Sequence, residues 1–158
     1  MSNFSNLPDP GILSDQFVAL RLNKITPAIP DKGWVPAYHF IITRADSQEA
    51  LGDLRLRVGS SDLLRLFAGH IGFSISEPHR GNRYACHALA VVASFAWKIG
   101  IDPVWITCNP ENLASRRTCE LAGAEYIETV SIPLGSDMYE RGERLKCRYR
   151  LCSQRDAA

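Results

Sequence analysis

The fold is decided by residues 69–100, which read GHIGFSISEPHRGNRYACHALAVVASFAWKIG. The first part, 69–76, has the composition of a strand, and residues 84–99 are apolar on most sides, which predicts a helix buried against a sheet. Between them lies the loop Arg-Gly-Asn-Arg-Tyr-Ala at 80–85. The first N–H groups of a helix have no partner inside it, and the helix dipole adds roughly half a positive charge there. The segment therefore predicts a site for an anion such as a diphosphate.

Alternation of apolar and polar residues extends this pattern on both sides. For example, Leu54 and Leu56 share one face of a segment, and Asp53 and Arg55 share the other, which predicts a half-solvated antiparallel strand. We expect strands at 17–25, 37–44, 51–58, 69–76, 104–108, 125–132 and 146–152, and helices at 84–99 and 112–122. Their order predicts an α/β (α+β) fold with a mixed, mostly antiparallel central sheet of six to seven strands and helices packed on it.

The composition is that of one soluble domain. The chain has 158 residues, 46% hydrophobic and 22% charged, and we expect a flexible arm at 1–13 followed by a single domain at 14–158. The net charge of +1 gives no support to nucleic-acid binding, and no apolar run is long enough for a membrane span. The spacing of the five cysteines fits no zinc-binding pattern, which argues against a metal site. Their odd number and the absence of an apolar leader favour the cytoplasm over secretion.

Two blocks of sequence resemble the GNAT (Gcn5-related N-acetyltransferase) family. Residues 80–85 are similar to its cofactor loop, Gln/Arg-x-x-Gly-x-Gly/Ala, with Arg83 in place of the middle glycine. That change is tolerable if the backbone avoids positive φ there, or if close approach to phosphate is kept without glycine. Residues 109–123, NPENLASRRTCELAG, resemble the Asn-x-x-Ser…Gly segment of the ribosomal-protein alanine acetyltransferase branch. The similarity covers about 69–132.

The resemblance implies an acetyl-CoA-dependent transfer of acetyl to a primary amine by direct attack, with no metal. The phosphates of coenzyme A would be held by the loop, Arg80, Gly81, Asn82, Arg83, Tyr84 and Ala85. The strand ending near Ile75 would splay from the strand at 104–108, leaving room for the pantetheine arm, and an N–H near Ile75 would polarise the thioester carbonyl. Asn112 would face the cofactor arm, and Ser115 would donate to the leaving thiolate.

The acid and base are left open by the residues. An alkylammonium with a pKa of ~10.4 must lose a proton before it attacks, so a carboxylate or His is needed. His70, Glu77 and Asp53 are the candidates, and none is favoured strongly. Many family members carry a tyrosine acid four residues before the glycine that ends the second helix, where this chain has Cys119.

Several features have a second interpretation. The loop at 80–85 alone could be an ordinary strand-to-helix turn, and Asn112 and Ser115 could simply cap a helix. The cations at 146, 148 and 150 form either a solvated face beside Glu140 and Glu143 or a contact for an acidic acceptor or a phosphate. The aromatic residues of 33–39 either line the acceptor site or pack into the core.

The segment 26–36 is short and rich in proline, where relatives place helices over the acceptor. This suits an open site for a peptide or protein amine, or one completed by a second subunit in a homodimer. Two rival functions remain. One is a non-catalytic acyl-CoA-binding sensor or partner module. The other is an unrelated nucleotide-binding domain, against which this chain's lack of a Gly-x-x-x-x-Gly-Lys signature argues. The identity of the acceptor amine does not follow from the sequence.

Overall fold

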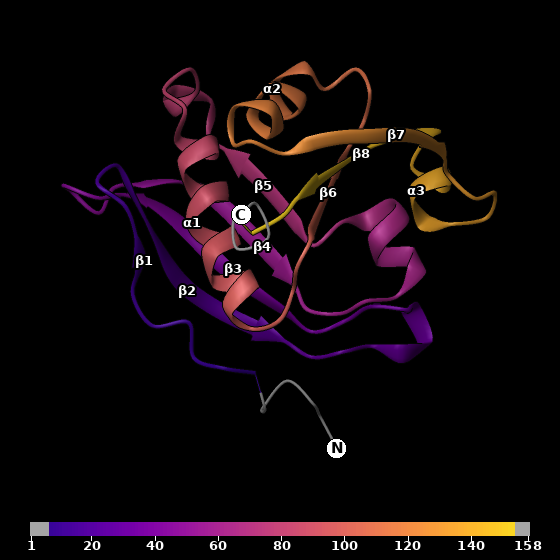
Figure 1. Ribbon diagram of the computed structural model, residues 1–158, viewed down its shortest axis with the longest axis horizontal. Coiled ribbons are helices and arrows are strands. Elements are labelled where there is room, and N and C mark those ends of the chain that lie inside the picture. Colours follow the sequence, from indigo (N-terminus) through magenta and orange to yellow (C-terminus); the bar gives the residue numbers. More distant parts are fainter. Residues whose placement is uncertain (1–6, 154–158) are drawn as a thin grey trace.

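The computed structural model describes residues 7–153, which form two antiparallel sheets with helices packed against them (Figure 1). The first sheet has the strand order β1-β2-β3-β4-β5 and the second β6-β8-β7. The strands are β1 Leu13–Ser14, β2 Val18–Thr26, β3 Ala37–Arg44, β4 Ala50–Arg57, β5 Ile71–Ile75, β6 Val104–Cys108, β7 Glu125–Ser131 and β8 Leu145–Leu151. The helices are α1 Tyr84–Lys98, α2 Leu113–Leu121 and α3 Asp137–Glu140, with short turns η2 Pro30–Lys32, η3 Leu64–Ala68 and η4 Glu77–His79.

The expected fold class is confirmed, with one difference in the sheet. The seven expected strands and both expected helices are present, each within two residues of its expected bounds. The short strand β1, the helix α3 and the turns η2 to η4 were not expected. The strands number eight within the described residues and divide between two sheets, because β5 and β6 do not form a ladder. The strand β6 is therefore the edge of its own sheet.

The core lies between the first sheet and α1. Alternate residues of β3, among them Tyr38 and Phe40, are buried on the face toward the helix. The opposing side of α1 is rich in alanine, including Ala88 and Ala93, which lets the helix approach the sheet closely. The Tyr38 ring meets the edge of Phe95 with the ring centres 5.3 Å apart. This packing fixes the N-terminal end of α1 beside the end of β5 (Figure 1).

The other face of the first sheet, which we call the outer face, is polar. It is formed by the residues that alternate with the core residues along β2 to β5. The cross-strand register places these residues in rows. One row consists of Lys24, His39, Arg55 and Gly72, and the neighbouring row consists of Arg21, Ile41, Asp53 and Ser74.

The two sheets are joined at one end of β5 and separate toward the other. The His70 N–H donates to the Trp105 carbonyl oxygen at 2.7 Å, and the Trp105 N–H donates to His70 Nδ1 at 2.9 Å. The Thr107 hydroxyl adds a bond to the Phe67 carbonyl at 2.7 Å. Beyond these bonds no ladder joins β5 to β6 within residues 7–153, so a gap opens toward Ile75.

Part of the N-terminal segment expected to be a flexible arm makes contacts. Residues 1–6 lie outside the described residues, but Leu13 and Ser14 pair with β2, and the Tyr38 hydroxyl donates to the Pro8 carbonyl. The residues that follow also cover α1 near its N-terminal end, because His87 bonds the Asp15 carboxylate at 3.0 Å. Farther along the helix, Ser94 and Lys98 are exposed.

Candidate functional site at the gap between the sheets

The loop before α1 leaves a run of main-chain donors without acceptors. The N–H groups of residues 81–86 have no hydrogen-bond partner within the described chain, and no side chain caps α1. Gly81 has a φ of +89°, which glycine adopts without strain, and the space beside it is open. Free donors at the start of a 15-residue helix form a cradle for a negatively charged group.

Arg83, at the middle-glycine position, keeps the backbone conformation of a glycine. Its φ is +63° and its ψ +20°, in the left-handed region, so the first of the two conditions for a non-glycine residue is wrong. The side chain is exposed, and the second condition, close approach of a phosphate to the loop without glycine, stays a prediction.

Arg80 links the loop to the end of β5. Its Nε donates to the Ile75 carbonyl oxygen at 2.9 Å, and its terminal nitrogens have no partner within residues 7–153. The Ser76 N–H bonds β4 through the Leu51 carbonyl, so by strand alternation the N–H of Ile75 points away from β4 and into the gap. The cradle and a free strand N–H are therefore neighbours in space.

The start of α2 faces the gap from the β6 side. The side-chain oxygen of Asn112 accepts from the Ser115 N–H at 3.1 Å, so Asn112 does cap the helix, and only its amide NH₂ is free for another partner. The Ser115 hydroxyl makes no hydrogen bond within the described residues. The side-chain oxygen of Asn109, just after β6, is buried without any donor. A buried acceptor without a donor suits a ligand that carries an N–H, such as the pantetheine amide.

The surroundings are unsuitable for acid or base chemistry at His70, an expected base, and at Cys119, which stands where many family members carry a tyrosine acid. Cys119 is fully buried, and burial raises the pKa of its thiol to about 12. His70 is 3% exposed with both ring nitrogens engaged, since Nδ1 accepts from Trp105 and Nε2 lies 3.0 Å from the Gly59 carbonyl. Because a main-chain N–H can only donate, Nδ1 carries no proton and Nε2 donates. His70 therefore joins the two sheets and has no free nitrogen for an acceptor, which corrects its assignment as a base.

The remaining base candidates differ in position. Asp53 is exposed on the outer face, directly across from Ser74 and one residue from the free N–H of Ile75. Glu77 is exposed in η4, on the loop side. His39, which the sequence did not indicate, lies one row from Asp53, and its Nε2 is 2.9 Å from the Thr26 hydroxyl. Burial, and then the nearby Arg55, Lys24 and Arg57, lower the pKa of His39.

The cations of β8 are paired rather than free. Lys146 contacts Glu143 as expected, but Arg148 is buried and pairs with Glu128 of β7. Arg150 pairs with Glu125 in the same way. These carboxylates neutralise the strand, so the interpretation of β8 as a contact for an anion loses its support.

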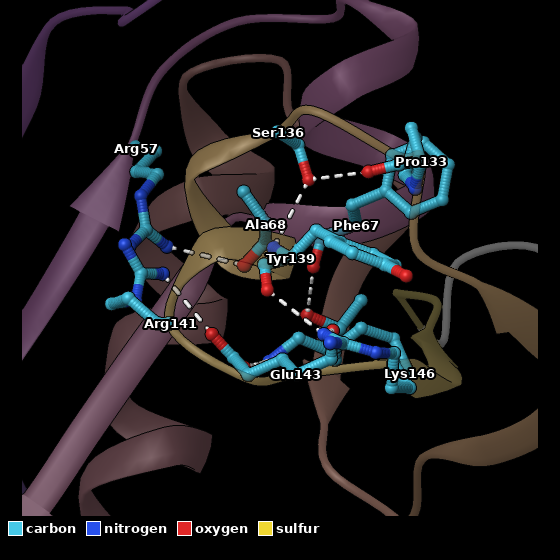
Figure 2. A network of polar contacts seen from close by, with 11 residues as sticks. Arg57, Phe67, Ala68, Pro133, Ser136, Tyr139, Arg141, Glu143 and Lys146 are labelled. Carbon is cyan, nitrogen blue, oxygen red and sulfur yellow. Dashed lines mark hydrogen bonds and ion pairs between the residues drawn. The ribbon is translucent and has the colours of Figure 1, made fainter.

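A network of main-chain contacts surrounds η3, at the joined end of the two sheets. Figure 2 shows Arg57 of β4 reaching the Ala68 carbonyl, beside the loop of Ser136 and Tyr139 around α3. The Nη1 of Arg57 lies 3.3 Å from that oxygen and 3.1 Å from the Gly69 carbonyl. Burial, and then repulsion from Arg55, lower the pKa of Arg57 to about 10, and no carboxylate pairs with it in the described chain.

Trp34, in the loop before β3, lies at the surface. Its side chain is 50% exposed, with Lys32 over the ring at 4.5 Å, so packing into the core is wrong for this residue. The role of this loop at the acceptor stays a prediction.

The described residues contain no group of three metal-ligating side chains and no helix long and apolar enough to cross a bilayer. All five cysteines are unpaired.

Comparison with known proteins agrees with this geometry. Residues 12–125 match the family model of the acetyltransferase (GNAT) domain. A search of curated proteins found no match. A solved GNAT-family protein from Chromobacterium violaceum has a TM-score of 0.67 at 15% identity, covering 96% of this chain and 90% of its own.

Two solved ribosomal-protein acetyltransferases also share the fold. RimL, in complex with coenzyme A, has a TM-score of 0.64 at 13% identity, with coverage of 92% of this chain and 99% of its own. An enzyme from Salmonella typhimurium that modifies the N-terminal serine of a 50S ribosomal subunit protein has a TM-score of 0.56 at 16% identity. The match covers 78% of this chain and 66% of that enzyme.

Proposed function

Because the chain belongs to the acetyltransferase (GNAT) family, we propose that it moves an acetyl group from acetyl-CoA to a primary amine of a peptide or protein N-terminus. The supporting observation is the run of unpartnered N–H groups at 81–86 beside the gap between β5 and β6. An N-terminal amine is favoured because a structural relative modifies such a serine and because the outer face here is open.

The residues around the gap fit coenzyme A. The N–H groups of 81–86, with the free nitrogens of Arg80 and Arg83, would hold the diphosphate. The buried oxygen of Asn109 and the amide NH₂ of Asn112 would contact the pantetheine arm. When bound, acetyl-CoA supplies an activated acyl group on a thiol leaving group.

The chain's own groups would act on the reacting atoms from opposite sides of the gap. The N–H of Ile75 would donate to the carbonyl oxygen of the acetyl group and stabilise the negative charge that develops there. The Ser115 hydroxyl would donate to the departing sulfur. The amine would approach from the outer face, where Asp53 would accept its proton directly or through water.

Binding of coenzyme A tests the site. By calorimetry, we expect Gly81→Asp and Arg80→Glu to weaken binding at least tenfold, because each brings a negative charge to the phosphates. Lys98→Glu, at the exposed far end of α1, is the matched control and should bind like the wild type. Equal affinity of all three variants and the wild type would refute the cradle.

Thiol release from acetyl-CoA tests the transfer. Acceleration by an N-terminal peptide or another amine supports an enzyme. Asp53→Asn should then lower kcat at neutral pH, and kcat of this variant should recover as the pH rises toward the pKa of the amine. Asp46→Asn, in the β3–β4 turn, is the control. Tight binding of coenzyme A without acceleration by any amine would instead support the non-catalytic acyl-CoA-binding module.

A further inference from the structure

The outer face carries a group of cations that have no carboxylate partners. Arg21, Lys24, Arg55 and Arg57 form no ion pair within residues 7–153. This contrasts with β8, in which all three cations lie beside a carboxylate. We call the four residues, together with His39, the cationic face.

These groups are close enough to repel one another. The register places Lys24, His39 and Arg55 in one row across β2, β3 and β4, with Arg57 two positions along β4. A shallow groove of about 270 Å³ lies on this row, lined by Lys24, His39, Arg55 and Asp53. The lowered pKa values of His39 and Arg57 have neighbouring cations among their causes, after burial. Asp53 is the single carboxylate of the groove and cannot neutralise the four cations.

The cationic face borders the proposed reaction centre. The same row continues to Gly72 of β5, and the next row places Asp53 beside Ser74, adjacent to Ile75. An acceptor that leaves its amine at Asp53 would therefore lay its following residues over Arg55, His39 and Lys24. Strands lie ~4.8 Å apart, so this row spans about 10 Å from β2 to β4, close to the length of three residues of an extended peptide.

We propose that the cationic face selects acceptors with acidic residues directly after the N-terminal amine. The proposal rests on the proposed function and names its substrate class. An acidic peptide supplies the missing carboxylates, and its extended backbone matches an open row across three strands better than a small molecule does. Charge pairs at such a surface contribute specificity and association rate, and they weaken as salt increases.

The test compares N-terminal peptides of equal length that share their first residue. One carries Asp-Glu-Asp after it and the other Asn-Gln-Asn, and thiol release gives kcat/KM for each. We expect at least a tenfold preference for the acidic peptide at low salt, from two or three surface charge pairs, and a loss of most of it at 0.5 M salt. In a Lys24→Gln, Arg55→Gln double variant the preference should fall below threefold. Arg117→Gln, exposed on α2, is the control that should retain it.

Direct binding separates this proposal from the proposed function. Fluorescence anisotropy of the acidic peptide, with coenzyme A present, measures peptide binding to the cationic face even if no transfer occurs. Loss of this binding in the double variant would support the proposal. Equal kcat/KM or equal affinity for both peptides would overturn the proposal while leaving acetyl transfer intact. Free glutamate or aspartate accepting acetyl better than the acidic peptide would also overturn it.

Discussion

At the scale of single residues, Arg83 combines an unfavourable backbone with a useful charge. A side chain in the left-handed region costs roughly 1–2 kcal/mol compared with a right-handed conformation, and glycine avoids that cost. The relatives' motif has glycine at this position, yet this chain accepts the conformation with an arginine. In the proposed function, the guanidinium beside the unpartnered N–H groups would provide one more cation for the diphosphate.

Arg83→Gly should therefore move stability and affinity in opposite directions. We expect unfolding free energy to rise by roughly 0.5–1 kcal/mol, because the strain is removed and glycine entropy offsets part of the gain. Affinity for coenzyme A should fall roughly twofold to fivefold with the loss of one exposed charge. Thermal melting and calorimetry measure the two effects, and a variant that gains both or loses both contradicts this account.

His70 gives stability a defined pH dependence. Burial lowers its pKa in the folded state from 6.5, and the pKa of His39 is lowered as well. The unfolded chain then binds more protons below pH ~6.5, so stability should be constant above that pH and fall below it, by at most ~1.4 kcal/mol per pH unit for each histidine.

Denaturant unfolding between pH 7.5 and 5.5 measures this fall. A His70→Gln variant can still accept from Trp105 and donate to Gly59, so it should fold and show a shallower decline. A slope equal to that of the wild type would mean that His70 takes up no extra proton on unfolding, which would contradict a lowered pKa in the folded state.

At the scale of elements, the end of β5 is positioned by the glycine opposite it. A Cβ on Gly52 of β4 would lie 2.0 Å from the Ser74 carbonyl oxygen and 2.9 Å from the Ile75 Cα. Gly52 thus permits the close approach of β4 that directs the Ile75 N–H into the gap. The strands themselves were predictable from alternation, but this approach was not, because it depends on the register between two strands.

Gly52→Ala should push the end of β5 away. We expect a loss of about 1–3 kcal/mol of unfolding free energy and weaker binding of coenzyme A. Gly72→Ala is the matched control, since its Cβ would meet nothing closer than 3.8 Å and a strand interior favours alanine. If Gly52→Ala melts and binds like Gly72→Ala, the close approach has no role in the site.

The start of α2 allows a cap and a ligand contact to be separated. Asn112→Ala removes the cap and should cost about 1 kcal/mol, whereas Asn112→Ser keeps a capping oxygen and should restore most of that stability. Both variants lack the amide NH₂, so both should bind coenzyme A more weakly. Binding of Asn112→Ser at wild-type strength would leave Asn112 as a cap alone.

At the scale of the whole molecule, the two sheets form a wedge that is closed at His70 and open at Ile75. The sequence predicted the strands, the two main helices and the cradle loop, because alternation, apolar helix faces and the motif at 80–85 are local signals. It did not predict the joined end, the paired state of β8 or the cationic face. Those features depend on which side chains meet across strands, as Arg148 with Glu128 and His70 with Trp105 show.

Coenzyme A should act on the wedge as a whole. A ligand at 100 times its dissociation constant raises unfolding free energy by ~2.7 kcal/mol, so melting temperature should rise with concentration. Hydrogen exchange should slow most at the facing edges of β5 and β6 and at 81–86, while β2 and β7 change little. Protection centred on the outer face instead would place the ligand on the wrong side of the first sheet.

The open outer face also bears on how quickly successive substrates follow one another. In enzymes that enclose their reactants, a lid or loop must open before each product leaves, and this opening often limits turnover. Over the described chain, the row from Lys24 to Gly72 has no such segment to displace. For the proposed transfer, we therefore expect no such motion to limit kcat, so a more viscous solvent should lower kcat/KM for a dilute acceptor more than it lowers kcat.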